Sequence, residues 1–349
     1  MVIMSLSAYY QQLGATLAPD GIPLHFGDLK AEYYAALQQC ILLDRSHEGR
    51  ITLSGADRFD LLNRMSTNNM LNMQPGEGRA TIFTNPNARI LDRVMVYHRS
   101  DDELLMLTSP GRGQAMAQYF KRNIFYNDKV ILRDLAAETH LFALHGVQAD
   151  TVMQRLVKSA SGIESFYGRD THIDEIPVFI GKVKPLVESA WVILVATEFA
   201  EAILSCIMQA GAQLAGSLTY NTLRIRAGMP ARELSTDYIP LELGLWDEVS
   251  FNKGCYTGQE IIARMESRNR LAKTLVRLDL SQYVEAPTEV FHQGKRAGMI
   301  TSSVLSPDDE IFAIGVIKTE FAKQDTQLNT SDGVPLRVSG LLGVQPLAD

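Results

Sequence analysis

The sequence predicts an α+β fold in which two β-α-β-β-α-β units are followed by a small antiparallel β-barrel. A strand that ends at Gly55 and leads into a helix has a counterpart 91 residues later at Gly146. A second pair of strand-to-helix turns repeats at an offset of about 88 residues, which indicates duplication of one structural unit. From Leu271 onward, short alternating strands separated by turns are typical of a barrel.

In the first unit, helical spacing of Leu29, Tyr33, Leu37 and Ile41 predicts that residues 1–45 are helical and partly amphipathic. A strand over Arg50–Leu53 then leads into a helix that Ser54 or Asp57 caps. The rest of the unit is expected to contain strands at Thr81–Thr84, Ile90–His98, Glu103–Thr108 and Lys129–Arg133, and a helix at Gln114–Arg122.

In the second unit, the strand Phe142–Gly146 leads into a helix at Ala149–Val157, and Trp191–Ala196 leads into a helix at Glu198–Gln209. The alternative to a true repeat is that any two strand-to-helix turns look alike. A helix at Thr219–Ala227, an irregular polar stretch and a helix at Gln259–Glu266 come next.

The C-terminal region is expected to form a barrel from the strands Thr274–Leu278, Glu289–Phe291, Gly298–Ser302, Ile311–Val316 and Leu336–Val338. Residues 294–298 are interpreted as a tight hairpin turn. We therefore expect three domains, over residues 1–135, 136–270 and 271–349.

Composition places the chain among ordinary soluble proteins, with 46% hydrophobic and 21% charged residues in a length of 349. The formal net charge of −7 argues against binding of DNA or a bulk RNA backbone. Residues 1–14 lack the pattern of a secretory signal, and apolar stretches such as Trp191–Ala196 are too short to cross a bilayer. We expect a soluble cytoplasmic protein with no membrane partner.

The three cysteines, Cys40, Cys206 and Cys255, are far apart, and none belongs to a C-x-x-C pair. This usage disfavours disulfides and structural zinc and fits a reducing cytoplasm. The seven histidines show no ligand spacing, so no metal site is predicted. Residues 111–113 could cradle a phosphate at a helix start, but an ordinary strand-to-helix turn explains the same residues.

Residues 253–260, with the sequence KGCYTGQE, are the sharpest chemical feature. Gly254 and Gly258 permit positive φ and close backbone approach to a ligand. Cys255 precedes a predicted helix N-terminus and follows Lys253 by two residues, and both features lower a thiol pKa. The segment therefore offers a reactive thiol, although an isolated free cysteine is more often a small buried hydrophobe.

The same segment resembles the K-G-C-Y-x-G-Q-E signature of the YgfZ-like folate-binding proteins, with all seven fixed positions present. Residues 223–230 and 239–242 resemble the stretches that precede this signature in the family, and residues 298–302 resemble its G-x-I-T-S barrel strand. Residues 55–92 are similar to the wider superfamily of glycine-cleavage aminomethyltransferases. The resemblance covers most of residues 40–320.

This resemblance implies a cloverleaf of two ferredoxin-like halves and a barrel, with tetrahydrofolate or a reduced derivative in a central hole. It implies catalytic roles for Cys255, Lys253 and Asp92. The residues implied in binding the folate are Asn68, Asp92, Arg224, Lys253, Gly254, Tyr256, Gly258, Gln259 and Glu260. The alternatives are that Asp92 is a solvated or capping residue and that Arg224 only pairs with an acid.

Two departures from the aminomethyltransferases decide between the relatives. Their acidic pair appears here as Asp92 followed by Arg93, and residues 187–192 lack the carboxylate-bearing strand that contacts the pterin in those enzymes. The first hypothesis is therefore a folate-dependent accessory factor for assembly or repair of iron–sulfur proteins, with iron–sulfur client or assembly proteins as partners. The second is one-carbon transfer from an amine to tetrahydrofolate, and the third is a folate-free scaffold.

Overall fold

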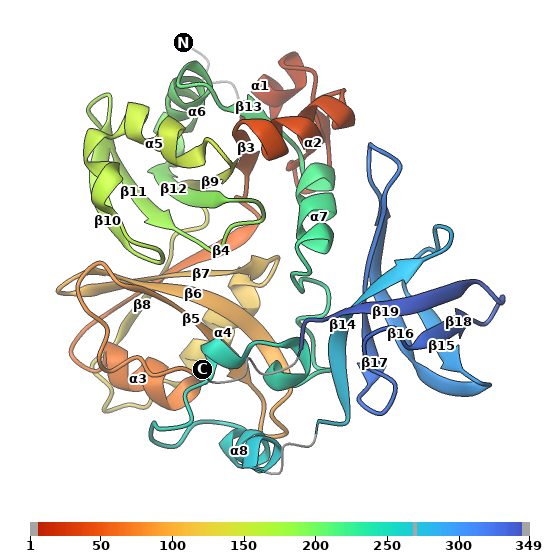
Figure 1. Cartoon of the computed structure of the whole chain (residues 1–349). Helices are drawn as coiled ribbons and strands as arrows, with labels where there is room; N and C mark the ends of the chain where they lie inside the picture. Colours follow the sequence, from red (N-terminus) through yellow and green to blue (C-terminus); the bar gives the residue numbers. More distant parts are fainter. Residues whose placement is uncertain (1–5, 268–270, 344–349) are drawn as a thin grey trace. The chain divides into compact units, whose positions relative to one another are not determined.

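The computed structural model describes residues 6–267 and 271–343, and Figure 1 shows the order of its elements. The chain divides into two compact units. The first comprises Met1–Leu61, Met70–Ala80 and Val94–Leu223, and the second comprises Leu62–Asn69, Thr81–Arg93 and Arg224–Asp349. Two short early segments thus belong with the C-terminal part of the chain. The three predicted domains describe a different division and stay a prediction.

The first 45 residues are less helical than predicted. Their elements are α1 (Leu6–Gln12), β1 (Thr16–Leu17), β2 (Pro23–His25), α2 (Leu29–Gln38) and β3 (Ile41–Asp44). The uniform helical prediction is wrong because Gly14 and Gly27 adopt positive φ and break the helix, while the Asp28 carboxylate accepts the Ala31 N–H and starts α2 anew. Residues 1–5 of that prediction lie outside the described residues.

A five-stranded sheet follows, in the order β5-β6-β7-β4-β8. Its strands and helices are β4 (Glu48–Ser54), α3 (Arg58–Met65), β5 (Gly78–Thr84), β6 (Ile90–Ser100), β7 (Glu103–Pro110), α4 (Gly113–Asn123) and β8 (Ile131–Asp134). The 81–84 end of β5 and the 90–93 end of β6 are grouped with the second unit. The five strands correspond to the five predicted ones, which is one strand more than a β-α-β-β-α-β unit contains.

The second sheet has six strands in the order β10-β11-β12-β9-β3-β13. Its elements are β9 (Thr139–Gly146), α5 (Ala149–Leu156), η1 (Lys158–Gly162), β10 (Gly168–Ile173), β11 (Ile176–Lys182), β12 (Ser189–Ala196), η2 (Thr197–Phe199), α6 (Ala200–Gln209) and β13 (Gln213–Leu214). The sequence β9-α5-β10-β11-β12-α6-β13 repeats β4-α3-β5-β6-β7-α4-β8 element by element, as expected for a duplicated unit.

The hydrophobic core next to the second sheet is formed by apolar side chains of β12, α5 and α6. Trp191, Ile193 and Val195 alternate along β12 and are buried with side chains from both helices, including Val152, Met153, Ile203, Leu204 and Ile207. This period of two on the strand, matched by helical spacing on α6, is the pattern from which these elements were predicted. Each such large side chain contributes about 1.5–3 kcal/mol when it is buried.

His145, near the end of β9 in the second sheet, is a buried titratable group. Its Nδ1 accepts the Leu186 N–H at 3.5 Å, and its ring lies edge-on to Tyr220. Burial, with a smaller effect of the Arg45 charge, lowers the pKa of His145 from 6.5 to about 3. The folded protein therefore excludes a proton that the unfolded chain binds between these two pH values.

As the pH is lowered from 6.5 toward 3, we expect His145 to decrease the free energy of unfolding by about 1.4 kcal/mol per pH unit. The stability is present above the unfolded pKa and is lost as the pH decreases, because the lowered pKa belongs to the folded state. Urea unfolding between pH 7 and 5 measures the slope. The variant His145→Gln keeps an acceptor and should show a shallower slope, and equal slopes in the two proteins would contradict this role.

The helix α7 (Ser217–Arg226) belongs to the first unit up to Leu223, and from Arg224 the chain enters the second unit. The second unit continues through η3 (Pro240–Leu243), η4 (Trp246–Glu248) and α8 (Gln259–Ser267) into a closed barrel. The barrel order is β14-β17-β16-β15-β18-β19, from β14 (Lys273–Leu280), β15 (Thr288–His292), β16 (Lys295–Leu305), β17 (Ile311–Lys318), β18 (Gln327–Thr330) and β19 (Pro335–Leu341). Small and branched side chains such as Val276, Ala297 and Ile300 fill its interior.

The hairpin turn predicted at residues 294–298 is shorter and begins one residue earlier. The turn is Gln293-Gly294, where both residues have positive φ, and His292 pairs with Lys295 across it. Two positive φ values are what a two-residue turn needs to match the twist of its strands, so Lys295 already begins β16.

Candidate functional site

Residues 249–258 connect η4 to α8 in the second unit without forming a helix or a strand. Their position is set by contacts with the two early segments of the same unit, residues 62–69 and 81–93. The Ser250 N–H donates to the Thr67 carbonyl, and the Thr84 hydroxyl donates to the Thr257 carbonyl at 2.6 Å. These contacts join parts of the chain that are more than 170 residues apart.

Lys253 is the main anchor of this segment. Its Nζ donates to the carbonyl oxygens of Asn63, Ser66 and Asn68, the last two at 2.7 Å. These carbonyls lie at the C-terminal end of α3 and just beyond it, where helix carbonyls lack partners within the helix. The ammonium also lies 5.0 Å from the centre of the Tyr256 ring. The three N–H groups of Lys253 are thus used by the protein itself.

Two opposing effects act on the pKa of Lys253. Burial lowers the pKa of the Lys253 ammonium from 10.5 to about 7. Three carbonyl dipoles aimed at one nitrogen act in the opposite direction, because they stabilise the charged form. Lys253 was predicted to act on the neighbouring thiol and on the folate, and its hydrogen bonds in the structure are to three backbone carbonyls.

Cys255 is the exposed cysteine among the three. Cys40 is buried, and burial raises its pKa to about 12. The Cys206 thiol is half-buried, donates to Asp174 at 3.3 Å, and has its pKa raised by burial and by that carboxylate. Accessibility therefore distinguishes Cys255, which is flanked by the open Gly254 and the buried Tyr256. Burial raises the pKa of Tyr256 to about 12.

Gly258, the residue before α8, has positive φ, whereas Gly254 does not. A Cβ at Gly258 would lie 2.9 Å from the Ala88 Cα, the Asn85 carbonyl oxygen and the Thr84 Oγ1. The close approach predicted for this glycine is thus made to the 85–88 turn of the chain. A Cβ at Gly254 would meet no atom within 4 Å.

The variant Gly258→Ala should lower the free energy of unfolding by about 2 kcal/mol, because alanine is strained at this φ and its methyl group meets backbone. Thermal and urea unfolding would measure the loss. Gly254→Ala is the matched control and should stay within about 0.5 kcal/mol of the unmodified protein. Equal effects at the two positions would show that the turn does not depend on Gly258.

Asn68 and Asp92 lie in the two early segments of the second unit, residues 62–69 and 81–93. Asp92 is buried on β6, and its Oδ1 accepts the Arg93 N–H at 2.9 Å. Asn68 is half-buried, accepts Lys253 through its carbonyl, and directs its side-chain amide toward the Asp247 carbonyl at 3.4 Å. The structure therefore connects the predicted residues Asn68 and Lys253 directly.

Arg93 pairs with Glu248, which sequence reasoning missed. The Arg93 Nε lies 2.8 and 2.7 Å from the two carboxylate oxygens of Glu248, and Nη2 approaches one of them at 2.7 Å. The Glu248 carbonyl also accepts the Thr67 hydroxyl at 2.7 Å. An unusual arginine after Asp92 was the signal that a compensating acid should lie nearby, but the sequence alone could not locate it.

Arg224 belongs to a second polar cluster, at the end of α7. Its Nη2 donates to the Ser302 hydroxyl at 3.0 Å, and its Nη1 lies 3.4 Å from a Glu233 oxygen. Ser302 donates to the other Glu233 oxygen at 2.6 Å. Arg224 thus pairs with an acid, as one alternative required, and its contact with a folate stays a prediction.

Gln259 and Glu260 begin α8. The Glu260 side chain is 87% exposed and pairs with Arg264 one turn later at 3.0 Å. Such a pair stabilises a surface helix by a few tenths of a kcal/mol. A role of these two residues in ligand binding stays a prediction.

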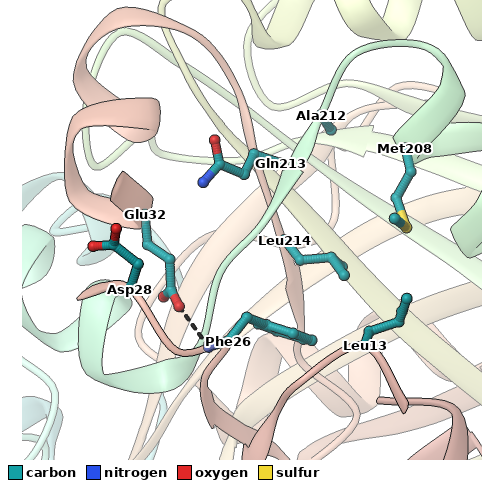
Figure 2. Close-up of a pocket in the computed structure, with 8 residues that line it drawn as sticks. All are labelled: Leu13, Phe26, Asp28, Glu32, Met208, Ala212, Gln213 and Leu214. Carbon is teal, nitrogen blue, oxygen red and sulfur yellow. Dashed lines mark hydrogen bonds between the residues drawn. The ribbon is translucent and has the colours of Figure 1, made fainter. Parts of the chain in front are cut away.

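The first unit contains a separate pocket of about 340 Å³, shown in Figure 2. Asp28 and Glu32 lie on one side of it and Leu13 and Met208 on the other; the remaining lining residues are Phe26, Ala212, Gln213 and Leu214. Glu32 is buried and accepts the Phe26 N–H at 2.6 Å, the Gly216 N–H at 2.9 Å and the Thr219 hydroxyl at 2.8 Å. This carboxylate therefore has a structural use, fixing the start of α7.

Among residues 6–267 and 271–343, no group of three or more His, Cys, Asp or Glu side chains could hold a metal ion. None of the helices in this part of the chain is long and apolar enough to cross a membrane.

Comparison with known proteins identifies the family. The protein-family model described as the GCVT N-terminal domain matches residues 4–253 of this chain. The Arabidopsis thaliana protein named "Putative transferase At1g60990, chloroplastic" is 31% identical over 338 residues, which cover 95% of this chain and 77% of that protein. An aminomethyltransferase of Geobacillus sp. (strain WCH70) is 25% identical over 338 residues, covering 93% and 92%.

The crystal structure of glycine cleavage system aminomethyltransferase T from Bartonella henselae has a TM-score of 0.87 at 20% identity, with 98% of both chains covered. At this identity the likeness concerns the fold, and it confirms the predicted α+β architecture with its C-terminal barrel. Because the family model covers more than half of the sequence, the chain belongs to the GCVT family. Its fold is aminomethyltransferase-like.

Proposed function

We propose that this protein binds a reduced folate and acts as an accessory factor in assembly or repair of iron–sulfur proteins, with Cys255 as its working thiol. The observation that carries the proposal is an exposed cysteine in a segment anchored by a half-buried lysine. The YgfZ-like signature at residues 253–260 supports the iron–sulfur role, and membership of the GCVT family supports the folate.

The residues of the second unit suit a pterin in one respect. A pterin presents adjacent N–H and amino donors, for which a carboxylate is the natural acceptor. Asp92 is a buried carboxylate on β6, and a carboxylate accepts several donors at once. Residues 187–192 do not provide a second one, because Glu188 is exposed and the Trp191 indole is buried and donates to Asp150. In this proposal Asp92 and Asn68 hold the folate.

Calorimetric titration with tetrahydrofolate tests the folate part. A micromolar dissociation constant, equivalent to about −8 kcal/mol, is expected. The absence of heat and of a thermal shift at millimolar ligand would favour the folate-free scaffold. Asp92→Asn, which keeps the shape but weakens the acceptor, should reduce affinity about tenfold.

The iron–sulfur part is tested in a deletion strain. We expect iron–sulfur enzyme activities to recover with the unmodified protein and to stay low with Cys255→Ala. Cys206→Ala is the matched control, because this thiol is half-buried and engaged by Asp174. Full recovery with Cys255→Ala would remove the thiol from the mechanism.

A second candidate function is transfer of a one-carbon unit from an amine to tetrahydrofolate, with Asp92 handling the proton. It is favoured by the likeness to proteins named aminomethyltransferase. It requires formation of 5,10-methylene-tetrahydrofolate from a glycine-derived, sarcosine or dimethylglycine donor. No product from any of the three donors would contradict this second function.

A further inference from the structure

Residues 121–133, which run from the last turn of α4 into β8, form the most exposed apolar stretch of the first unit. The three most exposed large apolar side chains of the described residues are Tyr126, Ile131 and Phe125, at 104%, 64% and 61% of full exposure. All three lie within seven residues. Scattered exposed apolar residues are normal, but such a concentration marks an interaction surface.

The turn that presents these side chains is fixed. The Asp128 N–H donates to the Phe125 carbonyl at 3.0 Å, and the Phe125 N–H donates to the Asp128 carboxylate at 2.7 Å. Lys129 is held in turn by Asp57, which accepts its N–H at 2.7 Å. The aromatic rings therefore extend from an ordered backbone, which lowers the entropy cost of burying them against a partner.

β8 supplies the second element of this surface. It is the last strand of its sheet and pairs, among the described strands, with β4 alone. Three of its four residues are exposed. One row of its backbone N–H and C=O groups thus points away from β4, which is a template for an added strand.

The charge of the segment differs in sign from that of the chain. Residues 121–134, which include all of β8, contain four cations, Lys121, Arg122, Lys129 and Arg133, and two carboxylates, Asp128 and Asp134, in a protein of net charge −7. Arg133 pairs with Glu138 at 3.2 Å, but both side chains are more than 60% exposed, so this pair is weak and exchangeable. Asp128 is already used within the turn.

We propose that residues 121–133 bind an extended acidic segment of a partner protein, which adds to the edge of β8, buries Tyr126 and Phe125 and pairs with the four cations. A strand of a peptide satisfies the free backbone groups of β8, and carboxylates complement the local positive charge. A lipid surface would offer no partner strand, and an anionic one is repelled by the remainder of the chain. This interaction is independent of the proposed folate and thiol functions.

Fluorescence anisotropy with two labelled octapeptides tests the proposal. One alternates glutamate with valine and the other alternates lysine with valine, so that only the charge differs. We expect binding of the acidic peptide, weakened by salt, and at least about tenfold weaker binding of the basic one. Tyr126→Ser should weaken the acidic peptide about tenfold, because an exposed aromatic anchor is lost.

Tyr283→Ser is the matched control, since this tyrosine is 44% exposed but lies between barrel strands β14 and β15. The proposal is overturned by equal binding of the two peptides, by no binding of the acidic one, or by equal losses in the two tyrosine variants. Vesicles containing phosphatidylserine are a further arm. Binding to them that Tyr126→Ser abolishes, without peptide binding, would assign the surface to a membrane instead.

Discussion

Replacement of Lys253 by methionine should lower the free energy of unfolding by about 3 kcal/mol. The methionine side chain preserves the unbranched stem but has no donor, so three carbonyls, of Asn63, Ser66 and Asn68, lose their shared partner. The desolvation of a buried ammonium is relieved at the same time, which limits the loss. The carbonyls decide the sign because each hydrogen bond lost from a charged donor costs about 1.5–3 kcal/mol.

Urea unfolding of Lys253→Met measures this loss, and Lys184→Met is the control, because Lys184 is an exposed lysine of the first unit. Limited proteolysis gives an independent readout, since residues 249–258 should be cleaved faster once their anchor is removed. A free energy within about 0.5 kcal/mol of the unmodified protein, with unchanged cleavage, would show that the three hydrogen bonds are not needed. The role of Lys253 would then have to be sought in ligand binding.

The architecture was predictable because its signals are local. The strand period of two at Trp191, Ile193 and Val195 and the glycine-marked turns at Gly55 and Gly146 are properties of short segments. The strands β10 and β11 were not predicted individually. In β10 the signal was weak, because Gly168–Ile173 alternates exposed and partly buried residues such as Arg169, Asp170 and Thr171, so its apolar side is short. In β11 an apolar run at residues 178–180 carried a signal that sequence reasoning missed.

The site was predictable only as a set of residue types. The sequence indicated that Cys255, Lys253 and Asp92 matter, but it could not show that Lys253 is bound by carbonyls of residues 63, 66 and 68. Backbone acceptors exist at every residue and leave no mark in a sequence. The same limit applies to Glu248, whose partner Arg93 lies 155 residues away. Long-range pairing has to be read from the structure.

Removal of Arg224 should have the largest effect of any single substitution considered, a loss of about 3–5 kcal/mol for Arg224→Met. Its partner Glu233 is fully buried, and the Ser302 hydroxyl and the Ala231 N–H also donate to the Glu233 carboxylate. Without the guanidinium, a buried negative charge keeps only neutral donors. The double variant Arg224→Met/Glu233→Met removes both charges and should be more stable than Arg224→Met, because apolar pairs of similar volume replace buried ion pairs at little cost.

This recovery separates the two roles considered for Arg224. If Arg224 only holds Glu233 and Ser302 in place, the double variant should regain both its free energy of unfolding and its affinity for tetrahydrofolate in calorimetry. If Arg224 also contacts the folate, stability should return while affinity stays at least about tenfold weaker, since a charged contact to the ligand is worth more than about 1.4 kcal/mol. A double variant that is no more stable than Arg224→Met would show that the cluster is held by Ser302 and the backbone rather than by the ion pair.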